Sequence, residues 1–293
     1  ILDLDLGTDK FDYIMAPRIY SWASELEQEC IFEIIRDALS PNGVAFVAYN
    51  TLPGWSSVQT LRDMMIFHGR NFSDKQEQAL EARRMLEFIS DNFALENSPY
   101  KKLLEAEIEF LDTVPYDVVV DDYLGSINNP TYFYKFIEKA NEKGLSYLAD
   151  SELPSMYLGN QTEKAVETLK EIDDIVRQEQ YVDFLNYRRY RSTLLVKDTA
   201  KINRELNSEA LNGLKLFPTY RASVPLEVNR AGKIEELELV NMWHPERTAS
   251  ISGNILCVCY QELLKSYPIP LSIDEITSTV VVTLTGVRKE EVE

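Results

Sequence analysis

Polar side chains that could take part in catalysis or ligand binding lie where two short apolar runs of the sequence end. Arg18 follows the first run, residues 11–16, and Tyr49 and Asn50 end the second, which begins at Val44. A side-chain amide such as that of Asn50 could orient an amine, and the hydroxyl of Tyr49 could accept a proton through a water molecule. The alternative for Asn50 is a bond to backbone atoms in a turn. Chemistry is therefore expected first at these two points.

Three aromatic residues flank these positions: Tyr20, Trp22 and Trp55. The face of an aromatic ring attracts a methylated cation or the stem of a lysine side chain, so Tyr20 and Trp22 are candidates for the walls of a cleft. The alternative is that both rings pack between a strand and a helix. Trp55 closes the turn Pro53-Gly54-Trp55, where it could point back toward the cleft or anchor the next helix.

The elements around these residues predict how they are positioned. An amphipathic helix is predicted for residues 25–39, and Ser40-Pro41-Asn42-Gly43 ends it. Buried apolar runs on both sides of one helix are typical of a β-α-β unit in a parallel sheet. Ligands of such sheets bind outside the carboxyl ends of the strands. We therefore expect Arg18 and Asn50 to lie at the same edge of a sheet.

The motifs FDYI, YSW, L-x-P-N-G and YNT-x-PGW within residues 11–55 resemble the later half of a class I S-adenosylmethionine-dependent methyltransferase domain. More narrowly, they resemble bacterial methyltransferases that carry a methyltransferase regulatory domain, some of which methylate protein lysines. A matching segment, EQYVDFLNYRRYRSTLLV, extends the resemblance to residues 1–197. The resemblance implies an α/β fold with part of a Rossmann-like sheet, S-adenosylmethionine as cofactor, and a protein or peptide substrate, expected to be basic.

The resemblance also implies the cofactor side of the site. Leu2 would lie in the connection whose backbone lines the adenine pocket, and Ala16, Pro17 and Arg18 would face the methyl sulfonium. Family members usually carry a histidine after that alanine. Here Pro17 occupies the position, and a nearby arginine is a poor neighbour for a sulfonium cation. We expect the glycine-rich loop and the ribose-binding carboxylate upstream of residue 1.

Two hypotheses from different classes follow. The first is a methyltransferase acting on protein lysine. The second is a degenerate, cofactor-free relative that works as a protein-interaction module, and it is motivated by Pro17-Arg18 and by the glycine-rich loop expected upstream. The residues encoded before residue 1 discriminate between the two, since a strand followed by G-x-G favours the enzyme.

Four regions are expected along the chain. Residues 1–57 form the later half of the methyltransferase sheet, and residues 58–114 form an inserted helical cap over the cleft. Residues 115–197 hold the last methyltransferase helix and strands with the regulatory region. Residues 198–293 form a small α+β, winged-helix-like module that contacts protein.

Finer expectations concern the third region. Residues 117–124, DVVVDDYL, are predicted to be extended, and their Asp121-Asp122 pair either is solvated or lines a groove for a cationic substrate. A helix over 131–143 is followed by a strand at 145–148. One helix is then predicted over 163–186, and a final strand contains RYRSTLLV.

The fourth region is predicted to contain two helices and a terminal strand. Ser252 is expected to cap a helix over 254–265, and Ser272 a helix over 273–278. The β-branched run 280–284 is expected to be a strand.

The composition of the chain restricts the classes of protein to which it can belong. The net charge of −18 disfavours nucleic-acid binding, which needs a basic surface, and it suits a basic peptide. The cysteines Cys30, Cys257 and Cys259 make no disulfide framework, which indicates a reducing cytoplasm, and with His68 and His244 as the only histidines a metal site is not expected. No apolar run reaches the roughly 20 residues of a membrane helix, and the first residues lack the features of a secretory signal.

Overall fold

The computed structural model describes residues 8, 10–94, 98–204, 212–223, 236–243 and 245–284. These residues belong to two compact units, residues 1–202 and residues 203–293. Leu2 and His244, both named above, lie outside the described residues. No helix in the described ranges is long and apolar enough to cross a membrane. In the same ranges, no cluster of three or more His, Cys, Asp or Glu side chains has the arrangement of a metal site.

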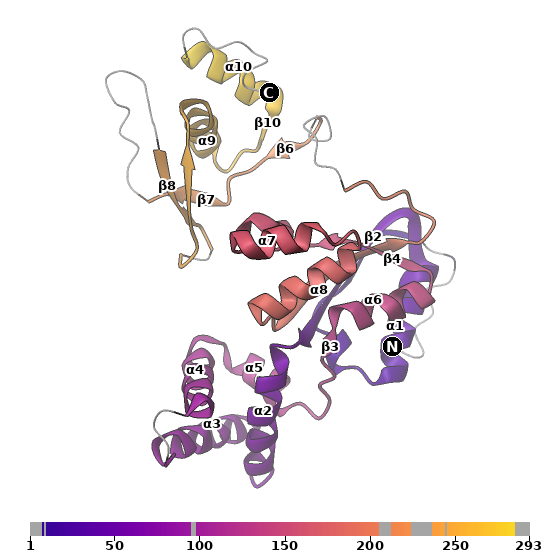
Figure 1. The fold of residues 1–293 in the computed structure, drawn as a ribbon, viewed down its shortest axis with the longest axis vertical. Helices are drawn as coiled ribbons and strands as arrows, with labels where there is room; N and C mark the ends of the chain where they lie inside the picture. Colours follow the sequence, from indigo (N-terminus) through magenta and orange to yellow (C-terminus); the bar gives the residue numbers. More distant parts are fainter. Residues whose placement is uncertain are drawn as a thin grey trace. The chain divides into compact units, whose positions relative to one another are not determined.

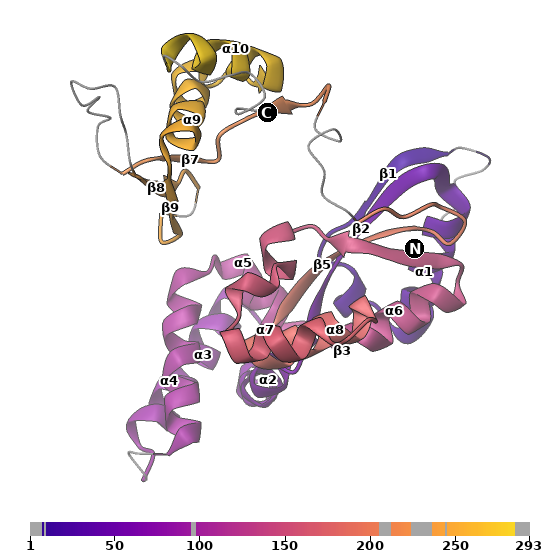
Figure 2. The same cartoon turned by 45° about the horizontal axis from the view of Figure 1, so that its top comes forward.

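A twisted sheet organises the first unit (Figures 1 and 2). Its strand order is β1-β2-β5-β4, with β1 at Phe11–Ala16, β2 at Leu39–Leu52, β5 at Tyr190–Lys197 and β4 at Leu145–Asp150. The strand β1 is parallel to β2, whereas β5 is antiparallel to both of its neighbours. A short strand β3, Thr131–Tyr132, pairs in parallel with the end of β2. The predicted β-α-β unit and the α/β class are confirmed.

The register brings the strand ends to one edge of the sheet. Ala16 at the end of β1 pairs with Val47, and Asn50 near the end of β2 pairs with Tyr190 at the start of β5. Because β5 runs antiparallel to β2 and β4, the end of β4 at Asp150 also lies at this edge. This edge is the one where ligands bind in open α/β sheets.

One face of the sheet is covered by α1 at Glu25–Ala38 and α6 at Phe133–Glu142. Ser24 and Glu27 form a capping box that fixes the start of α1, as the sequence S-x-x-E favours. Helical spacing then buries one side of α1 and α6 against β2. The core of this unit contains an aromatic cluster: Tyr20, Phe32, Tyr49 and Phe136.

A separate helical layer follows β2 (Figure 1). It contains α2 at Trp55–Gly69, α3 at Lys75–Asp91, α4 at Pro99–Thr113, α5 at Tyr116–Val118 and a π-helical turn η2 at Val119–Tyr123. These helices share a hydrophobic core of their own. The helical content predicted for residues 58–114 is present.

The predicted extended conformation of residues 117–124 is wrong. They form α5 and η2 after Pro115, which has an extended backbone and acts as the N-cap. Val119, Val120 and Tyr123 are spaced as one helical face and are buried in the core of the helical layer. Tertiary burial therefore overrides the β preference of the three consecutive valines.

The single helix predicted over 163–186 is also wrong. The chain forms α7 at Glu163–Lys170 and α8 at Ile175–Asn186, after the short turns η3 at Leu153–Met156 and η4 at Leu158–Asn160. Asp174 starts α8, because its carboxylate accepts hydrogen bonds from the backbone N–H groups of Val176 and Arg177 at 2.8 and 3.1 Å. An aspartate in this role requires a break in the helix before it.

The second unit is α+β, as predicted. Its strands β7 at Tyr220–Ala222, β8 at Glu236–Asn241 and β9 at Thr248–Ser252 form an antiparallel sheet. The short strands β6, Lys215–Leu216, and β10, Leu271–Ser272, pair with each other. The two helices are α9 at Asn254–Ser266 and α10 at Ile273–Thr283.

Two details of this unit correct the sequence predictions. Ser252 ends β9, and Gly253, with φ of +99°, is the residue before α9. Ser272 does cap the next helix through a capping box with Glu275. That helix continues through residues 280–283, where a strand was predicted, because Ile276 and Val280 lie four residues apart and are both buried.

Candidate functional site

A cavity of about 480 Å³ lies at the edge of the sheet where β1 and β2 end. Four residues singled out from the sequence line it together: Arg18, Asn50, Trp55 and Asp122. Four further residues complete the lining, and they come from α4, η2 and the segment that enters β5: Phe110, Tyr123, Arg189 and Tyr190. The volume lies within the ordinary range for small-molecule sites.

An ion pair closes one side of this cavity. Nη2 of Arg18 lies 2.8 Å from Oδ1 of Asp122, and Arg18 has a φ of +52°, in the left-handed region that non-glycine residues rarely adopt. The guanidinium also lies over the ring of Trp22 at 5.5 Å. The indole N–H of Trp22 in turn donates to the backbone oxygen of Asp121 at 3.0 Å. These contacts tie the turn after β1 to η2.

Burial favours the neutral, protonated form of Asp122. It raises the pKa of this carboxyl to about 6, with a further contribution from the neighbouring Asp121, and the attraction of Arg18 opposes the rise. A carboxylate with such a pKa binds and releases a proton near neutral pH, as acid–base groups in active sites do. The charge of Arg18 is also matched by Asp122, which removes much of the conflict expected between Arg18 and a sulfonium cation.

Asn50 is held rigidly in the wall of the cavity. It is 2% exposed, its backbone N–H donates to Oγ of Ser21 at 2.8 Å, and its Nδ2 donates to Oδ1 of Asn128 at 3.3 Å. Among the described residues, none donates a hydrogen bond to Oδ1 of Asn50. This oxygen is therefore the atom with which Asn50 can orient the N–H of a ligand.

Trp55 is the first residue of α2 and forms an aromatic wall. It is 5% exposed, and its ring lies 6.0 Å from that of Tyr123. Its Nε1 is buried and has no hydrogen-bond partner in the part of the chain that the structure describes. A buried donor without a partner is unfavourable, so this N–H is suited to meet an acceptor on a ligand.

Gly54 explains how Trp55 reaches this position. The backbone N–H of Gly54 donates to the carbonyl of Arg188 at 3.0 Å. A Cβ at residue 54 would lie 2.4 Å from the carbonyl oxygen of Tyr187 and 2.5 Å from that of Arg188. Only glycine therefore allows the start of α2 to approach the segment that leads into β5.

Tyr20 and Tyr49 lie elsewhere. Both are fully buried in the aromatic core beneath the strand ends, with ring centroids 5.7 Å apart, and neither lines the cavity. The hydroxyl of Tyr49 shares a hydrogen bond of 3.0 Å with Oγ1 of Thr193. Burial raises the pKa of both tyrosines far above the ordinary value. Ala16 ends β1 and packs partly against the same core, whereas Pro17 is exposed in the turn.

Sequence reasoning missed most of the remaining cavity lining. Asp122 was considered for a cationic groove, yet it was expected beside a strand rather than on a π-helical turn, a feature that is frequent at functional sites. The helical spacing of Val119, Val120 and Tyr123 was the signal that could have placed it. Tyr190 reaches the site because β5 inserts next to β2, and no local pattern encodes that pairing.

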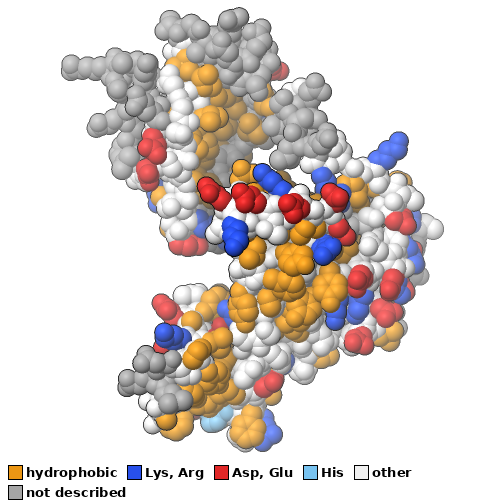
Figure 3. Space-filling view, viewed as in Figure 1, with side chains coloured by type: hydrophobic (Ala, Val, Ile, Leu, Met, Phe, Trp, Pro, Cys, Tyr) orange, Lys and Arg blue, Asp and Glu red, His pale blue; other side chains and the backbone are white. Residues whose placement is uncertain are grey.

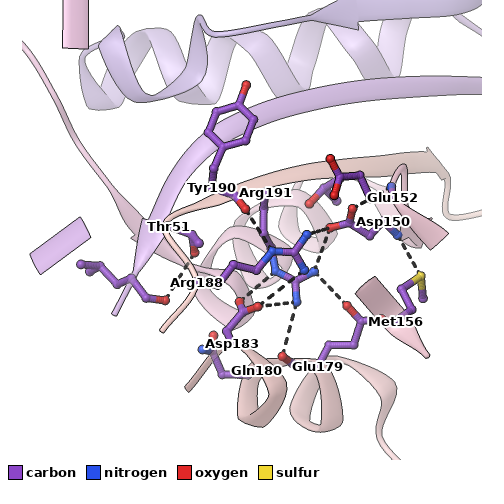
Figure 4. Close-up of polar contacts among 12 residues, drawn as sticks. Thr51, Asp150, Glu152, Met156, Glu179, Gln180, Asp183, Arg188, Tyr190 and Arg191 are labelled. Carbon is purple, nitrogen blue, oxygen red and sulfur yellow. Dashed lines mark hydrogen bonds and ion pairs between the residues drawn. The ribbon is translucent and has the colours of Figure 1, made fainter. Parts of the chain in front are cut away.

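A buried ion network fixes the start of β5 beneath the cavity (Figure 4). Arg191 is fully buried and binds both carboxylate oxygens of Asp183, at 2.8 and 2.9 Å, and one of Glu179 at 2.8 Å. Asp150 at the end of β4 contacts Arg191 at 3.4 Å and Arg188 at 2.9 Å. Burial raises the pKa of both Glu179 and Asp183, against the attraction of Arg191. The network joins β4, β5 and α8.

A larger cavity lies elsewhere in the first unit. It measures about 1060 Å³, lies along α7 and α8, and contains none of the residues predicted from the sequence to form the site. Exposed apolar side chains line part of it, including Tyr181, Phe184 and Leu185. Figure 3 shows hydrophobic side chains gathered over α8 in this region. It holds no strand end, so we place the candidate site at the smaller cavity.

The sheet topology and the cavity at the strand ends define a class I methyltransferase-like α/β protein. Residues 116–197 match the family model described as a predicted methyltransferase regulatory domain. The resemblance stated from the sequence is thereby confirmed.

The chain is similar to a solved protein of that class, PKMT2 from Rickettsia typhi. The structure of PKMT2 in complex with AdoHcy matches with a TM-score of 0.83 and 35% identity, covering 99% of this chain and 56% of PKMT2. A second PKMT2 structure matches with a TM-score of 0.82 at the same identity and the same coverage.

Among curated proteins, the uncharacterized protein RP789 of Rickettsia prowazekii (strain Madrid E) is 34% identical over 294 residues, which cover 100% of this chain and 53% of RP789. The uncharacterized protein RP028 of the same organism is 42% identical over 148 residues, which cover 50% of this chain and 59% of RP028. The chain thus spans about half the length of these relatives.

Proposed function

We propose that this chain belongs to an S-adenosylmethionine-dependent methyltransferase whose acceptor is a lysine of a protein substrate. The observation that carries the proposal is the cavity in which Arg18, Asn50, Trp55 and Asp122 meet at the ends of β1 and β2. The similarity to PKMT2, which was solved in complex with AdoHcy, supports the choice of cofactor.

The residues at this edge fit such a cofactor. When bound, S-adenosylmethionine supplies an electrophilic methyl group on a sulfonium. Ala16, Pro17 and Arg18 are the residues of this chain that would hold it, at the end of β1. The ion pair with Asp122 balances the charge of Arg18, and the unpartnered Nε1 of Trp55 is free to donate to a polar ligand atom.

The chain's own residues suit a lysine acceptor. The rings of Trp55 and Tyr123 offer apolar faces to the aliphatic stem. Oδ1 of Asn50 accepts a hydrogen bond from the amine and sets its direction. Asp122 takes up the proton that the ammonium must lose, because a lysine nitrogen is nucleophilic only when neutral. Holding the amine in one orientation is itself a large part of such catalysis.

Calorimetric titration with AdoHcy tests the proposal. The polypeptide should include any residues encoded upstream of residue 1, since we expect the glycine-rich loop there. We expect saturable heat for the wild type and for Asn50→Ala, because Asn50 acts on the acceptor. Absence of heat with both S-adenosylmethionine and AdoHcy would contradict the proposal and favour the protein-interaction module.

A matched pair of variants separates binding from chemistry. Asn50→Ala should keep AdoHcy binding and lose methyl transfer, whereas Asn92→Ala, at the exposed end of α3, should change neither. Equal methyl transfer by both variants would show that the cavity is not the acceptor site.

A further inference from the structure

A second cavity, of about 440 Å³, lies at the same edge of the sheet as the candidate site. It lies beside the end of β4 and the start of β5, and its lining includes Ser192 on β5 and Asn160 in η4. Tyr190 lines this cavity and the candidate site alike. The two cavities are therefore neighbours that share one aromatic wall.

The lining of the second cavity is polar and largely uncharged. It carries the side-chain amides of Asn160, Gln161 and Asn186 and the hydroxyl of Ser155. Each amide offers both N–H donors and an oxygen acceptor. This mixture matches the alternating N–H and C=O groups of an extended peptide, and it offers no concentration of positive charge for a phosphate.

Several of these groups are unused within the protein. Oγ of Ser155 is buried and has no hydrogen-bond partner in the described part of the chain. Gln161 and Asn186 make no side-chain hydrogen bond within the same residues, and Asn160 uses only its Nδ2, which donates to the carbonyl of Pro154 at 2.7 Å. A buried hydroxyl without a partner is unfavourable and indicates a position where a ligand atom or water belongs.

The net charge of the cavity lining is close to zero, because it contains one arginine and one glutamate. Arg188 donates to Asp150 at 2.9 Å and to the backbone oxygen of Tyr190 at 3.0 Å, so its charge is already satisfied. Glu152 is the carboxylate of the lining, and its exposed position suits a basic substrate segment. Figure 4 shows the Tyr190 ring directed away from the arginine network.

The spacing of the two cavities suits a peptide. Neighbouring strands lie roughly 4.8 Å apart, so the step from the end of β2 across β5 to the end of β4 is about 10 Å. An extended chain advances about 3.3 Å per residue and crosses this distance with about three residues. A lysine side chain in the candidate site would thus place the residues that flank it at the second cavity.

We infer that the second cavity binds the backbone of the substrate segment next to the acceptor lysine, in an extended conformation. The inference rests on the proposed function and adds the form of the substrate to it. Recognition uses the amides of Gln161 and Asn186 and the hydroxyl of Ser155, with Tyr190 separating the lysine side chain from its flanking backbone.

Two compounds that each contain one lysine side chain test this inference. Nα-acetyl-lysine amide carries the acceptor alone, and the pentapeptide acetyl-Gly-Gly-Lys-Gly-Gly-amide adds only backbone around it. Binding of each to the AdoHcy-loaded protein is measured by saturation-transfer NMR. We expect the pentapeptide to bind about 5- to 140-fold more tightly, as two net hydrogen bonds would give.

The double variant Gln161→Ala/Asn186→Ala should abolish this preference and leave the affinity for Nα-acetyl-lysine amide unchanged. Gln59→Ala, at a half-buried position of α2 where the amide donates to Asp63, is the matched control and should keep the preference. Equal affinities of the two probes for the wild type, or an unchanged preference in the double variant, would overturn the inference. These results leave the proposed function standing, because AdoHcy binding does not depend on flanking glycines. Failure of AdoHcy to bind would instead overturn the proposed function, and the inference with it.

Discussion

Arg18 and Asp122 are 104 residues apart in the chain, and their side chains form an ion pair of 2.8 Å in the lining of the candidate site. The pair joins the turn after β1 to the π-helical turn η2, which belongs to the segment that matches the regulatory domain. The regulatory segment therefore contributes directly to the site at the strand ends. The carboxylate of Asp122 balances the charge of Arg18, the cation expected next to the sulfonium.

The raised pKa of Asp122 predicts a pH-dependent stability. Its pKa of about 6 in the folded chain lies above the ordinary value near 3.9, so the folded state disfavours the charged form. This cost is absent below about pH 4 and is fully present above about pH 6. Asp122→Asn should therefore be more stable than the wild type by about 1–3 kcal/mol at pH 8 and no more stable at pH 4.

Urea unfolding at the two pH values measures this difference. Asp91→Asn is the control, because Asp91 is exposed at the end of α3 and is not among the charges that shift the pKa of Asp122. A gain for Asp122→Asn that is the same at pH 4 and pH 8 would argue against a buried carboxylate with a raised pKa.

The ion network around Arg191 predicts a large loss of stability when this one side chain is replaced. Arg191→Met keeps the volume and removes the charge that Asp183 and Glu179 share. Breaking a buried ion pair on one side typically costs 3–5 kcal/mol, and we expect about that loss in the free energy of unfolding. Arg36→Met removes an exposed pair with Asp37 and should cost no more than about 1 kcal/mol. Similar losses in the two variants would show that the buried network does not hold β5.

Gly54 predicts a steric effect at the site. Gly54→Ala introduces a Cβ within 2.4–2.5 Å of two carbonyl oxygens, so the start of α2 must move away from β5. We expect a loss of about 1–3 kcal/mol, measured by thermal unfolding, and weaker AdoHcy binding. Gly69→Ala near the other end of α2 meets its nearest atoms at 3.7 Å and should be neutral or stabilising by up to about 1 kcal/mol. An unchanged melting temperature for Gly54→Ala would refute the close approach.

The sequence predicted the part of the fold that local patterns encode. The apolar runs around Ile14 and Val47 and the amphipathic pattern of residues 25–39 placed β1, α1 and most of β2, and hence one edge of the sheet. The strand β2 begins at Leu39, so residues 40–43 belong to it and the predicted start at Val44 is wrong. The prediction that Arg18, Asn50 and Trp55 lie at the site followed from the position of that edge. The family resemblance supplied the class of protein and the cofactor.

The rest of the site depends on tertiary context. Three consecutive valines favour a strand, yet Val119, Val120 and Tyr123 bury a helical face, and this carries Asp122 to Arg18. Tyr190 lies next to Asn50 only because β5 inserts antiparallel between β2 and β4. Strand pairing between such distant segments follows from the whole core and not from any local signal.

Mass spectrometry of lysine-containing peptides incubated with S-adenosylmethionine shows whether the protein methylates lysine. The polypeptide should again include any residues encoded upstream of residue 1. We predict methyl groups on lysine Nζ, formed together with AdoHcy, and a rate lower by about 100-fold for Asn50→Ala, because the amine loses its orientation in the cavity. Absence of methylated lysine with a polypeptide that binds AdoHcy, or an Asn50→Ala variant as fast as the wild type, would contradict methyl transfer to lysine at this cavity.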